Sequence, residues 1–420
     1  MVQALRRRQP DTVRVATLDV AHSHRRSAVI VGPVRIPPTK ELIARFAAMA
    51  AVGPVTRVGL RPSTTSTRWR YAPNSVGDAV SSTVRAAASD PVTLLTPLRQ
   101  CPGDGIRVLA AGDHLAIDFS HGLGEVPLLD MLIAVLLGSV DPADPAVWAA
   151  YRHRVPPLPE AVLRAFGLGP QRLWPLWRQY RRGTAAVPAG SGSPEPSGIL
   201  PRPATYVGQI PADTVAELRR LRDSVLPGVS MFAVYTCALH QAFTDAGFDV
   251  DPTVTVPFDV RPYLPTGHST LATFSAGLEF TLDHRAGPRG LHAEMVAANR
   301  MARPVANLVV STLKARAALR AGHHPEWLAP PRPRLRLLHS SIGDVPRTGW
   351  LFSEPTAARI LVASDPAEPS GMTVTTSTAA GAVWLTAAFH DSLFDARRVG
   401  AALDSVAQQA RSLISPRKAR

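Results

Sequence analysis

Cysteine is scarce in this sequence: Cys101 and Cys237 are the only two in 420 residues. They lie far apart, no CxxC motif is present, and neither has a histidine at the spacing of a zinc ligand. The sequence therefore argues against a fold stabilised by disulfides and against a structural zinc site. We predict no metal site.

Long apolar segments are also missing. The longest, Val126 to Gly138, spans 13 residues and contains Asp130, so it is too short to cross a bilayer and predicts a buried helix. The N-terminal residues MVQALRRRQPD are basic but lack the apolar core of a secretory signal. We therefore expect a cytoplasmic protein without a membrane span.

Lysine is rare as well, with Lys40, Lys314 and Lys418 alone, so the net charge of +14 comes almost entirely from arginine. One interpretation is the coding bias of a GC-rich genome. The other is attraction to an acidic partner, such as a phosphate-bearing cofactor or an acidic carrier protein. The arginines are scattered and accompany no recognition motif, which argues against nucleic-acid binding.

What the sequence does contain is typical of a packed globular protein, with 45% hydrophobic and 19% charged residues. A length of 420 residues predicts about two domains. Residues 183–203 are rich in glycine, serine and proline and have no apolar period, which is typical of an exposed linker. The prediction is an N-terminal domain over 1–182 and a C-terminal domain over 204–420.

Both domains mix strands with helices, which predicts an α/β fold. In the first domain, we expect strands over 12–19, 55–60 and 105–119, the last as a pair around a turn, and helices over 39–51 and 127–137. In the second, the residues expected to cap helices at their N-termini are Asp213, Ser230 and Asp395. The strands expected there cover 205–210, 253–258, 276–282, 334–338, 373–377 and 383–388.

The segment from Leu115 to Gly138 has the most chemical content. A strand leads to His121, two glycines follow, and Glu125 stands four residues after the histidine. A neutral imidazole just past a strand end can accept a proton near neutral pH, and a carboxylate in the same turn can hold the turn through an ion pair. An ordinary histidine at a strand-to-helix junction has the same spacing, so the spacing alone leaves both interpretations open.

This segment resembles the HxxxDG motif of the chloramphenicol acetyltransferase-like superfamily. That superfamily includes nonribosomal peptide condensation domains, wax ester synthases and polyketide-associated acyltransferases. Other segments resemble it in the same order along most of the chain, namely 257–265 (PFDVRPYLP), 271–280 (LATFSAGLEF), 340–346 (SSIGDVP) and 371–395, which precedes a final helix.

The resemblance implies a fold of two similar lobes, each a mixed sheet with helices. The lobes of such proteins form a V-shaped pseudo-dimer with a central tunnel, and His121 would lie near its middle. A segment near 340–370 would cross from the second lobe to the first.

The resemblance also assigns roles to residues. His121 matches the catalytic histidine, Glu125 the structural aspartate, and Arg261 the arginine that pairs with that aspartate across the lobes. Arginine suits this role because it stays charged and grips a carboxylate with two hydrogen bonds. Asp259, Gly122 and Gly124 would shape the motif. The candidates for contacts to an oxyanion or substrate are Ser120, Thr273, Ser275 and Ser341.

Three positions depart from the superfamily pattern. Glu125 replaces an aspartate, so an extra methylene must be accommodated, and Val126 replaces a glycine. Ser120 stands where condensation domains carry a first histidine, which favours the branches that transfer acyl groups to oxygen.

The resemblance therefore implies an acyltransferase of secondary metabolism, in polyketide or nonribosomal peptide biosynthesis. It would move an acyl group from coenzyme A or an acyl carrier protein to a hydroxyl or amine of a natural-product or lipid acceptor. We expect a monomer without a permanently bound cofactor, whose substrate is acyl-coenzyme A or a phosphopantetheine-carried acyl group. Two alternatives stay open: a non-catalytic protein that binds a carrier protein or acyl chain, and an amide-forming condensation enzyme.

Other histidines have plainer interpretations. His22 and His24 form an HxH pair without an identifiable third metal ligand. His323 and His324 precede a proline and are expected in a loop, and His390 lies between a strand and the last helix.

Overall fold

The structure is a computed structural model that describes residues 11–83, 91–100, 105–153, 155–184, 202–322 and 332–415. Most of the predicted linker lies outside these residues, as do Cys101, His323 and His324. Helix α6 (Leu173–Thr184) and strand β8 (Pro203–Ile210) flank this gap. The predicted start of the linker, residue 183, falls inside helix α6, whose last turn continues through Gly183. The predicted end, residue 203, falls inside strand β8, where Pro203 pairs with His390.

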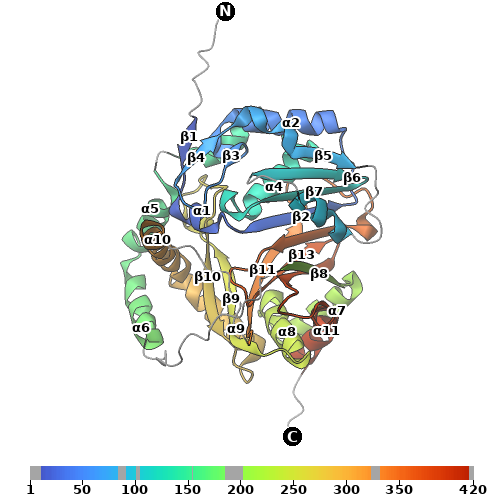
Figure 1. The fold of residues 1–420 in the computed structure, drawn as a ribbon. Coiled ribbons are helices and arrows are strands. Elements are labelled where there is room, and N and C mark those ends of the chain that lie inside the picture. Colours follow the sequence, from blue (N-terminus) through green and yellow to red (C-terminus); the bar gives the residue numbers. More distant parts are fainter. Residues whose placement is uncertain are drawn as a thin grey trace, which may run out of the picture.

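The first half of the chain forms a sheet whose described strands run in the order β12-β2-β7-β6-β5 (Figure 1). Strand β12 comes from the C-terminal half and pairs antiparallel with β2, with Ile360 opposite Val31. It lies within the range where a crossing segment was predicted. The bounds are β2 (Arg26–Gly32), β5 (Val80–Thr83), β6 (Ile106–Ala111), β7 (His114–Ser120) and β12 (Arg359–Ser364).

Helices and a small second sheet cover the first sheet. The apolar residues of α2 and α4 pack with Trp69 of the small sheet and with the strands into one buried core. The small sheet consists of β1 (Thr12–Arg14), β4 (Arg68–Tyr71) and β3 (Leu60–Arg61). The helices of this half are α1 (Thr17–His22), α2 (Thr39–Val52), α3 (Leu95–Gln100), α4 (Val126–Leu137), α5 (Pro157–Val162) and α6.

Two strand predictions in this half are wrong in part. Residues 17–19 belong to helix α1, where the Asp19 carboxylate accepts a hydrogen bond from Ala16 N at 3.3 Å and caps the first turn. Residues 54–56 form a 3₁₀ turn that begins at Pro54, and strand β3 starts only at Leu60. In both places a short apolar alternation fits a buried helical turn as well as a strand.

The second half forms a sheet with the described order β10-β9-β11-β13-β14-β8, which lies below the first sheet in Figure 1. Helices α8 and α11 pack together, and α11 also contacts β8 and α7. The strands are β9 (Val250–Asp259), β10 (Ser275–Thr281), β11 (Leu335–Val345), β13 (Gly371–Ala379) and β14 (Ala382–His390). The helices are α7 (Ala212–Val225), α8 (Met231–Asp245), α9 (Gly287–Arg300), α10 (Arg303–Ala321) and α11 (Ala396–Ile414).

Helix caps follow the sequence at two of the three predicted positions. Ser230 and Asp395 accept hydrogen bonds from backbone N–H groups in the first turns of α8 and α11. The prediction for Asp213 is wrong, because α7 already begins at Ala212 after Pro211. Asp213 stands in the first turn, where its charge still favours the helix dipole.

Strand β12 also joins the two halves. It contacts β13 and β14 of the second sheet as well as its partner β2. Ser377 of β13 donates a hydrogen bond to the Ile360 carbonyl at 2.5 Å, and Trp384 of β14 donates one to Ala358 at 3.1 Å. The predicted α/β class with a mixed sheet in each half is confirmed. No described helix is both long enough and apolar enough to cross a membrane.

A buried histidine lies in the middle of the second sheet. His339 of β11 is 0% exposed, its ring stacks on Phe232 at 4.4 Å, and its Nδ1 lies 2.7 Å from the Thr236 hydroxyl. Burial lowers the pKa of His339 to about 3. The ring is therefore neutral in the folded protein at neutral pH.

Replacing His339 with Gln should reduce the acid sensitivity of the fold. The pKa of His339 is lower when folded than when unfolded, so its contribution to stability is complete above pH 6.5 and is lost as pH falls toward 3. Between pH 6.5 and 5 that loss is about 2 kcal/mol. Urea unfolding at pH 7 and pH 5 should show a smaller drop for the variant than for the parent. Equal drops in the unfolding free energy of the two proteins would mean that the His339 ring is solvated in the folded state.

Candidate active site

The turn after β7 carries the motif histidine. Residues His121–Leu123 form a 3₁₀ turn between β7 and α4. A Cβ atom on Gly122 would clash with the Asp19 carbonyl, and one on Gly124 would clash with the Leu271 carbonyl. Both glycines are thus needed for close backbone approach: Gly122 to α1 of the first half, and Gly124 to a loop of the second half.

The His121 ring is held from one side by serine hydroxyls. Its Nδ1 lies 3.0 Å from Ser27 Oγ on β2, and Ser27 Oγ lies 2.8 Å from Ser364 Oγ on β12. The ring also meets His22 edge-on, with 5.4 Å between ring centroids. His121 is partly exposed, and no described residue forms a hydrogen bond with its Nε2.

The serine pair can select one tautomer of His121. If Nδ1–H donates to Ser27 and Ser27 donates to Ser364, the imidazole keeps a lone pair on Nε2. The reverse direction puts the proton on Nε2 and leaves no basic nitrogen free. Base chemistry by His121 therefore needs the first direction.

Burial and positive neighbours keep His121 neutral. Desolvation, followed by the charge of Arg25 and a contribution from His24, lowers the pKa of His121 to about 3. Burial also lowers the pKa of Arg25 to about 10, so its guanidinium stays charged at neutral pH. That guanidinium contacts Nδ1 of His22, whose pKa is lowered well below its usual value, first by burial and then by Arg25.

The contact expected between Glu125 and Arg261 is present. Glu125 Oε2 lies 3.1 Å from Arg261 Nη1, and it also accepts hydrogen bonds from Phe274 N at 3.1 Å and from Ser275 Oγ at 2.8 Å. The pair is nearly buried, with side chains 11% and 9% exposed. The glutamate side chain, with its extra methylene, is accommodated here, and its contact joins the histidine turn to the second half.

Arg261 uses its remaining donors on its own loop. Its Nε donates to the Thr270 carbonyl at 2.8 Å, its Nη2 donates to Ala272 at 2.7 Å, and Asp259 accepts from Nη1 at 2.9 Å. Thr273 of the same loop donates to the His121 carbonyl at 3.2 Å. The loop and the histidine turn thus form one hydrogen-bonded unit.

The hydroxyl candidates are placed differently from one another. Ser120 is 1% exposed and donates to the Ser23 carbonyl, so its proton is already used. Thr273 and Ser275 likewise donate to His121 O and Glu125. Ser341 is exposed on β11, and its Oγ accepts a bond from Gly343 N at 3.2 Å, which leaves the Ser341 proton available.

A second ion pair at the turn was missed by the sequence analysis. Arg57 Nη2 lies 2.8 Å from Asp19 Oδ2, and the same guanidinium donates to the carbonyls of Gly122 and Leu123 at 2.9 and 2.8 Å. Burial raises the pKa of the Asp19 carboxyl, and the Arg57 charge opposes this rise. The two residues belong to no local motif, so no sequence signal pointed to them.

A cavity of about 300 Å³ lies beside this network. Its lining includes Arg57, Tyr151, His153 and Thr270–Ala272. It therefore borders the residues that hold the turn. The tunnel that the resemblance implies stays a prediction.

No family model and no curated protein sequence matches this chain. Solved structures do match. The trichothecene 15-O-acetyltransferase of Fusarium sporotrichioides matches with a TM-score of 0.67 and 11% identity, covering 96% of this chain and 95% of that one. The condensation domain of the monacolin K polyketide synthase matches with a TM-score of 0.60 and 11% identity, over 96% and 97% of the two chains.

An epimerization domain from the third module of tyrocidine synthetase B also matches, with a TM-score of 0.54 and 11% identity, covering 97% of this chain and 98% of that one. These matches run along nearly the whole of both chains, so they cover both halves. At 11% identity, what is shared is the fold.

Replacing Glu125 with Gln should destabilise the protein. It removes the nearly buried one of the two carboxylates that face Arg261 and leaves only the half-exposed Asp259, at a cost of about 2 kcal/mol. Glu217→Gln is a matched control, because it breaks a pair with Arg411 whose side chains are 49% and 45% exposed, and should cost less than about 1 kcal/mol. Guanidinium unfolding of both variants measures the difference. Equal effects would show that the buried pair does not anchor the turn.

Proposed function

Because this chain has the chloramphenicol acetyltransferase-like fold, we propose that it is an acyltransferase with His121 as its general base. It moves an acyl group from a thioester of coenzyme A or an acyl carrier protein to an acceptor hydroxyl. The observation that carries the proposal is the His121 ring itself. The ring is neutral and partly exposed, and among the described residues its nitrogens have one hydrogen-bond partner, Ser27 at Nδ1.

In the proposed reaction, His121 Nε2 removes the hydroxyl proton as the acceptor oxygen attacks the thioester carbonyl. A carbon–oxygen bond forms, the carbon–sulfur bond breaks, and the proton passes from the imidazolium to the departing sulfur. Ser27 accepts a hydrogen bond from Nδ1–H throughout, which holds the reactive tautomer. No covalent acyl-enzyme is required.

A pKa of about 3 describes the resting ring, whose charged form is disfavoured by burial and by Arg25. The negative charge of a tetrahedral intermediate changes that balance, because it neutralises the surrounding positive charge and stabilises an imidazolium beside it. The same positive charge attracts an anionic oxyanion. Among the candidate hydroxyls, Ser341 keeps an available proton, so we assign to it the contact to an oxyanion or substrate.

The acceptor and donor are proposed by class. Ser120, in place of a first histidine, favours oxygen over nitrogen as the acceptor atom. The net charge of +14 suits both coenzyme A and an acidic carrier protein, which are anionic. Structures of the same fold include a trichothecene acetyltransferase and a polyketide synthase condensation domain, which supports a natural-product acceptor. A monomer in the cytoplasm, without a resident cofactor, completes the proposal.

A non-catalytic relative that binds a carrier protein or acyl chain is the second candidate. The observation that favours it is the strongly lowered pKa of His121. A histidine that is so weak a base in the resting protein fits a protein that binds its partner without catalysis. Tight carrier binding without turnover of any thioester supports this candidate. Turnover with amine acceptors in preference to alcohols supports an amide-forming enzyme instead.

Replacing His121 with Ala should lower turnover by about 10²–10⁴-fold, the usual contribution of a general base. Thioester cleavage in the presence of a panel of alcohols, followed through the released thiol, measures the effect. His284→Ala, an exposed histidine of the second half, is the control and should keep full turnover. Ser27→Ala keeps the imidazole but removes its Nδ1 partner, so its loss should be partial. Unchanged turnover in the His121 variant contradicts the assignment.

The value of kcat/KM should not fall below pH 6.5, as it does for an enzyme whose base is an ordinary histidine. With a pKa of about 3, His121 stays neutral from pH 7 to pH 5, so kcat/KM should stay nearly constant in that range. A base of pKa 6.5 would lose about 30-fold by pH 5. Circular dichroism at each pH verifies that the protein remains folded. An inflection near pH 6.5 would contradict this expectation and would show that the His121 ring is solvated in the free enzyme.

A further inference from the structure

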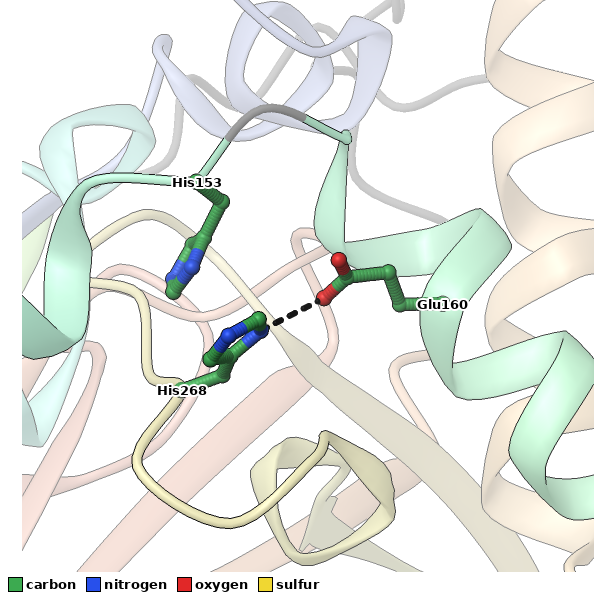
Figure 2. Close-up of side chains that lie close together, drawn as sticks. All are labelled: His153, Glu160 and His268. Carbon is green, nitrogen blue, oxygen red and sulfur yellow. Dashed lines mark hydrogen bonds and ion pairs between the residues drawn. The ribbon is translucent and has the colours of Figure 1, made fainter.

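Three potential metal ligands meet where the two halves of the chain come together. His153 follows the 3₁₀ helix Pro145–Tyr151, Glu160 lies on α5, and His268 lies in the loop that leads into β10. One ligand atom from each residue lies within 4.8 Å of the other two. Figure 2 shows the three side chains gathered around a common space.

The geometry within this cluster suits coordination. His268 Nδ1 lies 3.1 Å from Glu160 Oε2, a separation that two ligands of one ion can share (Figure 2). The His153 and His268 rings lie 4.4 Å apart between centroids, tilted by 35°. An ion between them needs only small shifts of side chains that are partly or fully exposed.

A hydrogen bond outside the cluster orients one ligand. His153 Nε2 donates to the Ser269 carbonyl at 2.5 Å, so the proton sits on Nε2 and the lone pair sits on Nδ1. Histidines that bind metals commonly donate their second ring N–H to a carbonyl in this way, which fixes the ring and makes the ligand more basic.

We propose that His153, Glu160 and His268 bind one Zn²⁺ ion. Two imidazoles and a carboxylate form the mixed nitrogen and oxygen set that zinc accepts, with a fourth position left for water. Mg²⁺ prefers ligand sets made of oxygen alone. His268 is exposed and His153 and Glu160 are partly exposed, so an ion reaches the site from solvent.

The ion would act as a clamp beside the active-site network. His268 and Ser269 directly precede Thr270 and Ala272, whose carbonyls hold Arg261 and through it Glu125. His153 and Glu160 belong to the first half. Zinc would therefore fix this loop to the first half, in a positioning role. The proposal does not depend on the proposed acyltransfer.

Titration of the chelator-treated, full-length protein with ZnCl₂ in a calorimeter tests the site. The expected result is saturation at one Zn²⁺ per chain, no binding of Mg²⁺, and a higher melting temperature with zinc. His153→Ala, Glu160→Gln and His268→Ala should each weaken zinc binding by at least about 10-fold. His284→Ala should bind zinc like the parent protein.

Glu160→Gln keeps the shape of the side chain, so it separates loss of a ligand from loss of folding, which circular dichroism monitors. Absence of saturable zinc binding overturns the proposal. Zinc binding that survives in all three ligand variants also overturns the proposal. The same holds for zinc binding that is lost in His22→Ala instead, because the ion then binds elsewhere.

Discussion

The contact between Glu125 and Arg261 holds the candidate active-site region together. It is the point where the turn after β7 meets a loop of the second half, and both side chains are nearly buried. A buried ion pair stabilises a protein only when its remaining donors and acceptors are also satisfied. Here the carboxylate receives two further hydrogen bonds, and the guanidinium donates to two carbonyls and to Asp259. The pair thus fixes two backbone segments at once.

Arg57 also holds the histidine turn, from inside the first half. It pairs with Asp19 and donates to the carbonyls of Gly122 and Leu123, so the backbone after His121 is gripped from both sides. The imidazole between these supports is left with one hydroxyl partner on Nδ1. Its neutral state follows from burial together with the nearby charge of Arg25. Rigid backbone support and a neutral ring are the two conditions that proton transfer at this position requires.

The cavity of about 300 Å³ connects this network to the three-ligand cluster, since its lining includes both Arg57 and His153. The loop over residues 268–273 therefore has several tasks: it contributes His268, the carbonyls that hold Arg261, and the Thr273 hydroxyl bonded to His121 O. Whatever fixes this loop also fixes the histidine turn.

The sequence by itself determined the α/β class, most of the strands, the helices α2, α4, α7, α8 and α11, and the turn that carries His121, because periodicity, caps and glycines act over a few residues. The resemblance to the superfamily also implied that Glu125 and Arg261 are partners. The short apolar segments at 12–19 and 55–60 misled in part, since a few residues of apolar alternation fit a helical turn as well as a strand. Only the tertiary structure decided the contacts across long separations: Asp19 with Arg57, Ser27 with His121 and Ser364, and His153 with His268. Such pairs leave no trace in local pattern, because tertiary packing, either within the first half or between the two halves, is what brings them into contact.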